Sequence, residues 1–261
     1  ALQSDDWFGR LCSQLASWNI GDSGRVALAI LVPVTLSQWL LSALDDFLFG
    51  LLWIVVAVLL LLYSFGRGNF QQWMDRYRRQ CRNADFEGAY LTIPVSTGAS
   101  ESAQPPESAR EVHALVQRHV VYEGYQRWFA VLFYFVLLGP VGALAYRLLQ
   151  LCREQFETDT AARWLFIADW VPARLLAASF SLTGDFVHSR EPLMASLFEL
   201  RLDIGDLLHR VASTAIASPA ADAPQASFED QAVSDSEQLG SLLSRSAACW
   251  VAVISLLVLL G

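Results

Sequence analysis

The stretch Arg163-Trp-Leu-Phe-Ile-Ala-Asp-Trp-Val-Pro-Ala-Arg-Leu-Leu176 organises the chain, because it places charged side chains inside an otherwise apolar run. Pro172 suits the first position of a helix, where its missing N–H costs nothing, and it biases the preceding residue toward an extended backbone. We therefore expect a helix to begin at Pro172 and to run to Gly184, with Asp169 just outside it.

Arg174 would fall in the first turn of that helix. A cation at this position opposes the helix macrodipole by roughly 0.3–1 kcal/mol, so we expect an anionic partner. Asp169 is one such partner. The functional alternative is an anionic ligand group, such as a phosphate held between the helix N-terminus and the guanidinium, and contact with lipid headgroups is a third interpretation.

The composition is that of an integral membrane protein. Of the 261 residues 54% are hydrophobic and only 17% are charged, and the mean hydropathy is +0.36. All 18 basic residues are arginine, which excludes a phosphate-binding lysine, a Schiff base and a lysine general base. The net charge is −8 and no basic stripe is interleaved with aromatic residues, so we expect no nucleic-acid partner.

The residues that usually hold metals are dispersed along the chain. None of the 4 cysteines belongs to a CxxC pair or to a His/Cys cluster. His113 and His119 are too far apart in sequence for the i, i+4 geometry of a helical metal site. We therefore expect unpaired cysteines, no metal site and no cofactor.

The N-terminal part of the chain is expected to lie on the membrane and then to cross it. In residues 1–25 apolar side chains recur with helical spacing, which predicts an interfacial helix. Residues 26–65 hold two apolar runs, each close to the ~20 residues that cross the hydrocarbon core, and they predict a transmembrane hairpin. The arginines at its open end, opposite the acidic tip Asp45-Asp46, place that end in the cytoplasm.

Residues 66–127 are polar and are expected to form a cytoplasmic helical region. Their arginine-rich part, 69–90, predicts a juxtamembrane helix that either attracts anionic lipid headgroups or docks a soluble partner. Residues 96–106 are rich in Ser, Ala, Gly and Pro and predict a flexible loop.

A helix from about Glu107 is expected to continue into a transmembrane helix, 128–150. Along it His119, Glu123 and Arg127 follow at i, i+4 steps and form a polar column. This column is either a solvated face with weak ion pairs or a site of proton handling or ligand contact at the membrane surface.

Gly139-Pro140 and Gly142 interrupt that transmembrane run, which permits a kink and the close approach of another helix. The same small residues could serve contacts between subunits, so a homodimer is a further expectation.

The C-terminal part begins with a helical region, 151–212, that carries the central stretch, with a re-entrant or interfacial helix pair around 161–184. Residues 213–246 predict a flexible loop, and 247–261 predict a C-terminal transmembrane helix that is short for a full span. The whole chain therefore predicts an all-α membrane protein, a bundle of about four transmembrane helices with amphipathic juxtamembrane helices.

Two motifs carry a resemblance to a known family. They are Asp169-Trp-Val-Pro-Ala-Arg-Leu175 and, upstream, Trp128-Phe-Ala-Val-Leu-Phe-Tyr-Phe-Val-Leu-Leu-Gly-Pro-Val-Gly-Ala-Leu-Ala-Tyr-Arg147. In order and spacing they resemble AmpE, a family of inner-membrane proteins of Gram-negative bacteria, and more distantly the CobD/CbiB cobinamide-phosphate synthases. The resemblance covers most of residues 60–185. It implies a multi-pass inner-membrane protein linked to β-lactamase induction and peptidoglycan signalling.

The chain departs from the synthases where a ligase that uses ATP needs carboxylates to hold Mg²⁺. Residues of other types stand at most of these positions, which in this chain are Tyr122, Glu123, Gln126, Gln150, Arg153, Leu165, Phe166 and Asp169. The resemblance therefore implies a regulatory or sensory protein without catalysis. The alternative is a synthase-like membrane enzyme that acts on a phosphorylated or lipidic substrate.

We expect the ligand-binding residues, if the chain binds an anionic or phosphorylated ligand, to be Arg174, Asp169, Arg163, Arg147, Glu123 and His119. Membrane lipids are the other expected partners. A carrier of a small anionic solute is a third hypothesis, although the chain lacks the inverted repeats that such carriers usually have.

Overall fold

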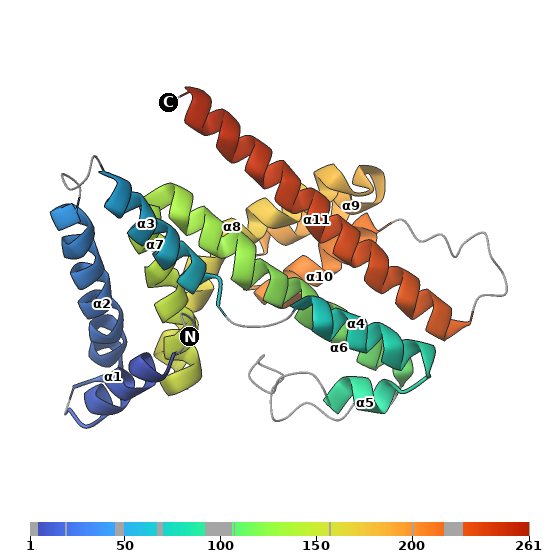
Figure 1. The fold of residues 1–261 in the computed structure, drawn as a ribbon. Coiled ribbons are helices and arrows are strands. Elements are labelled where there is room, and N and C mark those ends of the chain that lie inside the picture. Colours follow the sequence, from blue (N-terminus) through green and yellow to red (C-terminus); the bar gives the residue numbers. More distant parts are fainter. Residues whose placement is uncertain are drawn as a thin grey trace. The chain divides into compact units, whose positions relative to one another are not determined.

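The computed structural model is built of helices, with no strand among the residues it describes: 5–18, 20–44, 50–66, 70–91, 106, 108–156, 158–199, 201–216 and 227–260 (Figure 1). The prediction of an all-α protein is confirmed. The chain divides into two compact units, unit 1 (Ala1–Gly68 and Gln126–Pro172) and unit 2 (Asn69–Tyr125 and Ala173–Gly261). Asp45-Asp46 and nearly all of the expected loop 96–106 lie outside the described residues.

Unit 1 packs three N-terminal helices against α7. These helices are α1 (Asp6–Ala16), α2 (Asp22–Leu44) and α3 (Leu51–Ser64), and α7 is Ala130–Phe156. The face that α1 buries carries Phe8, Cys12 and Leu15, whose spacing of four and three residues forms one helical stripe. The helix predicted within residues 1–25 corresponds to α1, and α2 begins at Asp22.

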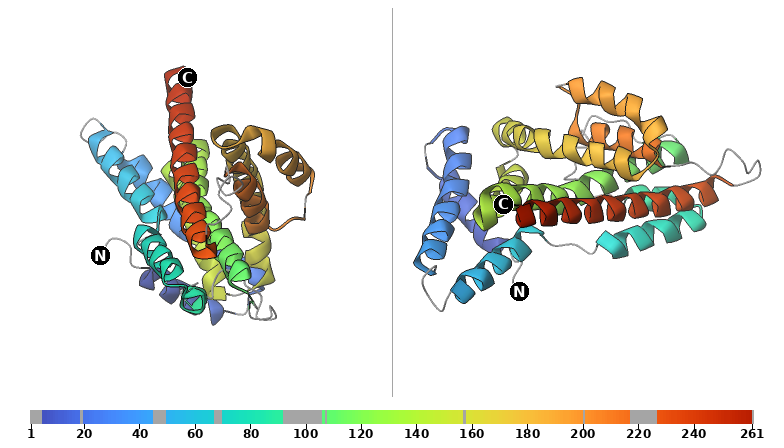
Figure 2. Two further views of the ribbon diagram at one scale, coloured as in Figure 1. Left: turned by 90° about the vertical axis from the view of Figure 1, so that its right-hand side faces the viewer. Right: turned by 90° about the horizontal axis from the view of Figure 1, so that it is seen from above.

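Unit 2 is a layer of shorter and longer helices. It contains α4 (Phe70–Arg82), α5 (Phe86–Leu91), α6 (Ala109–Gly124), the end of α8 (Asp159–Thr183), α9 (Phe186–Phe198), α10 (Ile204–Ala215) and α11 (Phe228–Leu260). Figure 2 shows α4, α6 and α11 side by side, and α10 packs against both α6 and α9.

A single helical run extends from α6 through a π-helical turn, Tyr125–Phe129, into α7. The run bends inside α7, where Gly139 has φ 73° and ψ −164°. Only glycine adopts this backbone without a steric penalty, and Pro140 cannot donate a backbone hydrogen bond to the preceding turn. The predicted kink at Gly139-Pro140 is therefore confirmed.

Among the described residues, four helices are long and apolar enough to cross a membrane: α2, the α6 to α7 run, α8 and α11. Leucine, valine and isoleucine side chains lie exposed along each of them, and a lipid environment is what such surfaces require. The prediction of a membrane protein is confirmed. The set of helices differs from the expected one, because α8 is long enough to span while the described part of α3 has only 14 residues.

The structure contradicts the expected start of a helix at Pro172 and the expected helix pair around 161–184. Instead α8 is one helix of 25 residues with Pro172 inside it, and Asp169 lies within the helix as well. A proline in a helix leaves the carbonyl four residues earlier without its usual donor. Here that carbonyl belongs to Ala168, and the hydroxyl of Tyr134 on α7 donates to it at 2.9 Å.

The expected loop 213–246 is also wrong over most of its described part. Residues 213–215 end α10, and α11 begins at Phe228 and runs for 33 residues. The alanine and serine residues that suggested a loop form part of a buried stripe along the first half of α11, namely Ala232, Ser236, Leu239, Leu242, Leu243 and Ser246. This spacing of three and four residues packs a helix closely against its neighbours. The 33 residues of α11 also correct the prediction that the C-terminal transmembrane helix is short for a full span.

Candidate functional site

The candidate ligand residues fall into both units. Asp169, Arg147 and Arg163 belong to unit 1, whereas Arg174, His119 and Glu123 belong to unit 2. Each group has a distinct environment.

Asp169 is buried in unit 1, with 1% of its surface exposed. The hydroxyl of Tyr146 on α7 donates a hydrogen bond of 2.7 Å to the Asp169 carboxylate. The ring of Tyr146 stacks on Tyr134 with the centroids 5.2 Å apart. A carboxyl group in a membrane helix is costly to bury unless its oxygens accept hydrogen bonds, so this contact holds Asp169 in place and marks it as a candidate functional group.

Arg147 joins α7 to the N-terminal segment of unit 1. Its guanidinium donates to the Asp5 carboxylate and to the Gln150 side-chain oxygen, each at 3.1 Å. Asp5 also accepts a hydrogen bond of 2.9 Å from the hydroxyl of Tyr63. Sequence reasoning missed Asp5 because it lies 142 residues from Arg147.

Arg163 lies on the exposed surface of α8. Six positions separate it from Asp169, which directs the two side chains about 120° apart around a helix of about 100° per residue. The structure therefore does not bring Arg163 to the Asp169 carboxylate.

Arg174 is buried in unit 2, with 6% of its surface exposed. Its guanidinium donates to the carbonyl oxygens of Leu197, at 3.4 Å, and Glu199, at 3.0 Å. These carbonyls belong to the C-terminal end of α9, where the helix dipole is negative and a cation is favoured. The expected first-turn position is wrong, because Arg174 lies well inside α8, and these contacts are dipolar rather than ionic.

His119 and Glu123 lie one turn apart on α6, as expected. His119 is buried, and the Trp73 ring of α4 meets it edge to face with centroids 5.3 Å apart. Glu123 is partly exposed. His119 therefore lies at a contact between α4 and α6.

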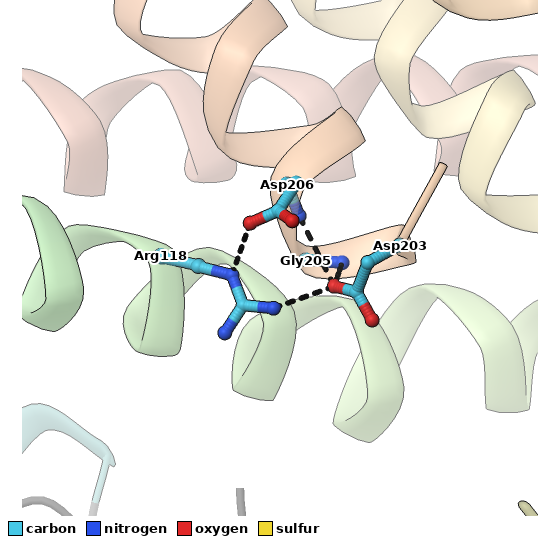
Figure 3. Close-up of polar contacts among 4 residues, drawn as sticks. All are labelled: Arg118, Asp203, Gly205 and Asp206. Atoms are coloured by element: carbon cyan, nitrogen blue, oxygen red, sulfur yellow. Dashed lines mark hydrogen bonds and ion pairs between the residues drawn. The ribbon is translucent and has the colours of Figure 1, made fainter. Parts of the chain in front are cut away.

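Sequence reasoning missed an ionic cluster between α6 and α10. Arg118 donates to Asp203 at 2.6 Å and to Asp206 at 2.5 Å, with the two carboxylates on either side of the guanidinium (Figure 3). Asp203 is also the N-cap of α10, since its carboxylate accepts from the backbone N–H of Gly205 and of Asp206. Only the Asp-x-x-Asp capping pattern could have indicated this end of the cluster.

A second cluster joins α4, α6 and α11. The Tyr77 hydroxyl lies 2.5 Å from Nδ1 of His113, and Nε2 of His113 lies 3.5 Å from the Asp235 carboxylate. Burial raises the pKa of Tyr77, so its hydroxyl stays protonated. On α10, burial lowers the pKa of His209, with the charge of Arg118 acting in the same direction and that of Asp206 against it.

No group of three or more His, Cys, Asp or Glu side chains that could hold a metal ion occurs among the residues that the structure describes. The partly buried Arg147 and the buried Arg174 are the groups best suited to an anionic ligand, since arginine keeps its charge away from water and offers several donors.

Residues 2–261 match a family model, that of the regulatory signalling modulator protein AmpE. The chain belongs to the AmpE family. AmpE is a family of the inner membrane, and with four helices able to span, this AmpE chain is a multi-pass inner-membrane protein. The resemblance seen in the two motifs is therefore confirmed.

Two more distant relatives of this AmpE chain are cobalamin biosynthesis proteins CobD. The protein of Chromobacterium violaceum is 29% identical over 177 residues, which are 64% of this chain and 54% of the relative. That of Stutzerimonas stutzeri is 29% identical over 195 residues, 68% of this chain and 61% of the relative. The match thus spans less than two thirds of the length of either relative. No solved structure matches the chain.

Proposed function

We propose that this AmpE-family chain is a regulatory or sensory protein of the inner membrane, without catalysis, that links the state of the cell wall to β-lactamase induction. The observation that carries this proposal is the continuity of α11. Its first half buries a stripe against α4, α6 and α10, and its last ten residues carry exposed apolar side chains suited to lipid. A rigid helix of this kind couples a change in the membrane to the helical layer in which it begins.

The charged groups in the matched motifs support a structural use. Arg174 holds the end of α9, Arg147 holds Asp5 and Gln150, and Asp169 accepts from Tyr146. Groups that already satisfy one another cost little to bury and are suited to holding two helices in a defined arrangement.

The alternative is a membrane enzyme of the synthase type that acts on a phosphorylated or lipidic substrate. The identity to the two CobD proteins favours it, as does the buried carboxyl group of Asp169. Mass spectrometry of the protein from mild detergent is the direct check. A phosphorylated molecule that co-purifies with the native chain and is lost from Arg174→Gln would favour the alternative.

The test of the regulatory proposal is to break α11 between Ser246 and Ala247 with three glycines, in cells that lack the native protein. Glycine interrupts helix continuity at a cost of about 1 kcal/mol per residue. The packing of residues 228–246 and the membrane insertion of residues 247–260 should therefore both persist. We expect normal protein levels in the membrane but loss of β-lactamase induction.

The matched control carries the same three glycines between Ala221 and Asp222, in the connection between α10 and α11. It should retain induction. Full induction in the Ser246 insertion variant would overturn the proposal.

A further inference from the structure

Helix α9 presents an apolar face that none of the described residues of unit 2 covers. Its residues Phe186, Val187, Met194 and Phe198 are between 52% and 77% exposed. At about 100° per residue they fall within an arc of about 120°, whose centre lies about 110° around the helix from the centre of the face that buries Ser189, Leu193 and Ser196. Large exposed apolar side chains gathered on one face of a helix mark a surface with a partner.

The level of the membrane surface in unit 2 follows from the contacts between α8 and α11. The hydroxyls of Thr183 and Ser246 lie 3.0 Å apart, and the indole N–H of Trp250 donates to the hydroxyl of Ser179 at 2.8 Å. The last turn of α8 therefore lies beside the start of the apolar half of α11. Since both helices are candidate spans, α8 leaves the membrane where α11 enters it.

Helix α9 begins at this same level. Only Gly184 and Asp185 separate it from α8, and a side chain at Gly184 would lie 2.5 Å from the carbonyl oxygen of Ala215 at the end of α10. Asp185 caps α9 by accepting from the backbone N–H of Val187 and of His188. The turn is thus tight, and it keeps the start of α9 beside the end of α8.

An exposed apolar side chain also lies in the last turn of α8, close in sequence to this face. Leu182, 70% exposed in the last turn of α8, lies four residues before Phe186. Arg190 is exposed within the same arc of α9. A long arginine side chain among apolar neighbours can extend past them, so that its guanidinium reaches lipid phosphates.

We propose that α9 is an interfacial helix whose face of Phe186, Val187, Met194 and Phe198 inserts into the boundary between lipid headgroups and acyl chains. In such helices the apolar side chains enter the bilayer by about 5–10 Å while the backbone lies in the plane of the surface. The occupant of the face is the bilayer itself, because the face adjoins a span and begins where that span ends. Arg174, which donates to the carbonyls of Leu197 and Glu199, lies nine residues before Thr183, so the C-terminal end of α9 is tied to α8 about 13 Å further into the span and is the deeper end of the helix.

The test places a fluorescent thiol label at Val187→Cys or Met194→Cys in the full chain with Cys249→Ala. The three remaining cysteines are buried and should not react, which labelling of the Cys249→Ala chain alone verifies. The chain is held in nanodiscs of phosphatidylcholine and phosphatidylglycerol. Lipids carrying a nitroxide near the headgroup or near the acyl-chain end, and iodide in water, are compared as quenchers.

Two control positions define the scale. Glu237→Cys lies exposed on α11 about 13 Å before Ser246, and Val253→Cys lies exposed on the same helix about 10 Å beyond Ser246, at about 1.5 Å per residue. We expect the shallow nitroxide to quench the two α9 labels roughly twofold or more strongly than it quenches Glu237→Cys, and more strongly than the deep nitroxide does.

Three results would overturn the proposal. Iodide quenching equal to that of Glu237→Cys would show that the face meets water. Quenching strongest for the deep nitroxide, as expected for Val253→Cys, would place α9 within the hydrocarbon core. Protection from all quenchers would show that a protein surface, such as a second copy of the chain, covers the face.

Discussion

Two arginines of unit 2 are held in opposite ways. Arg174 is buried in a candidate span and donates to the uncharged carbonyl oxygens at the end of α9. Arg118, whose side chain is 27% exposed, lies between the carboxylates of Asp203 and Asp206, each half exposed or more. The first cation is stabilised by oriented dipoles in an apolar setting, and the second by full charges near water.

The two kinds of contact contribute different amounts to the free energy of unfolding. Removing a donor from buried carbonyls leaves them without partners, at a cost of about 1–3 kcal/mol for each group. Ion pairs in contact with water contribute only about 0–1 kcal/mol, and salt weakens them further. Substitution should therefore destabilise the α8 to α9 junction strongly, while salt should affect it little. The α6 to α10 junction should lose less stability on substitution, and its contribution should depend on salt.

The largest effect is expected from Arg174→Met, which keeps the length of the side chain but removes its donors. The carbonyls of Leu197 and Glu199 would lose them, so the free energy of unfolding should fall by about 3 kcal/mol. Thermal unfolding in detergent, followed by circular dichroism, measures the change. Arg163→Met, at an exposed position of the same helix, is the matched control and should change stability little. Equal stability of the two variants would contradict the buried role of Arg174.

Next in size is the loss of the cap of α10. Asp203→Ala removes both the N-cap and one partner of Arg118, so it should destabilise the chain by about 1–2 kcal/mol. Asp206→Ala removes only the ion pair and should cost less than about 1 kcal/mol. Unfolding of both variants in the same detergent gives the comparison. A larger loss for Asp206→Ala would show that the charge, and not the cap, dominates this junction.

A smaller effect is the salt dependence of the stability that is lost when each arginine is replaced. Arg118→Met should cost about 1 kcal/mol in about 0.05 M salt, and much of that difference should vanish in about 0.5 M salt. The deficit of Arg174→Met should be the same at both concentrations, because salt does not reach a buried contact between a cation and carbonyls. If the two deficits respond to salt alike, the contrast between the junctions is wrong.

The smallest effect concerns pH. Burial lowers the pKa of His209, so below its ordinary value of 6.5 the unfolded chain binds a proton that the folded chain does not. The free energy of unfolding is therefore expected to fall as pH drops below about 6.5 and to level off once folded His209 is protonated. His209→Gln should make this decline shallower. Measurements between about pH 5 and about pH 7.5 that show parallel curves would exclude His209 as a source.

Arg118 offers a further control for the pH dependence. Its charge also lowers the pKa of His209, while Asp206 opposes it. In the Arg118→Met chain the decline attributed to His209 should accordingly be smaller.

Much of the fold could be predicted from the sequence because the signals are local. Apolar runs predicted membrane helices, Gly139-Pro140 predicted the kink, and two motifs with their spacing predicted the family. Burial of charge at Asp169 and Arg174 was also foreseeable, since both lie in an apolar run. Their partners were not, because Tyr146 and the end of α9 are each 23 or more residues away.

The sequence by itself determined that this is a helical membrane protein of the AmpE family, because hydropathy and motif spacing are properties of adjacent residues. Only the tertiary structure decided that α8 passes through Pro172, since the hydroxyl of Tyr134 replaces the missing donor at Ala168. It likewise decided that α11 is helical from Phe228, where small residues are buried against neighbouring helices. In both cases a partner distant in sequence supplies the free energy that the local pattern lacks.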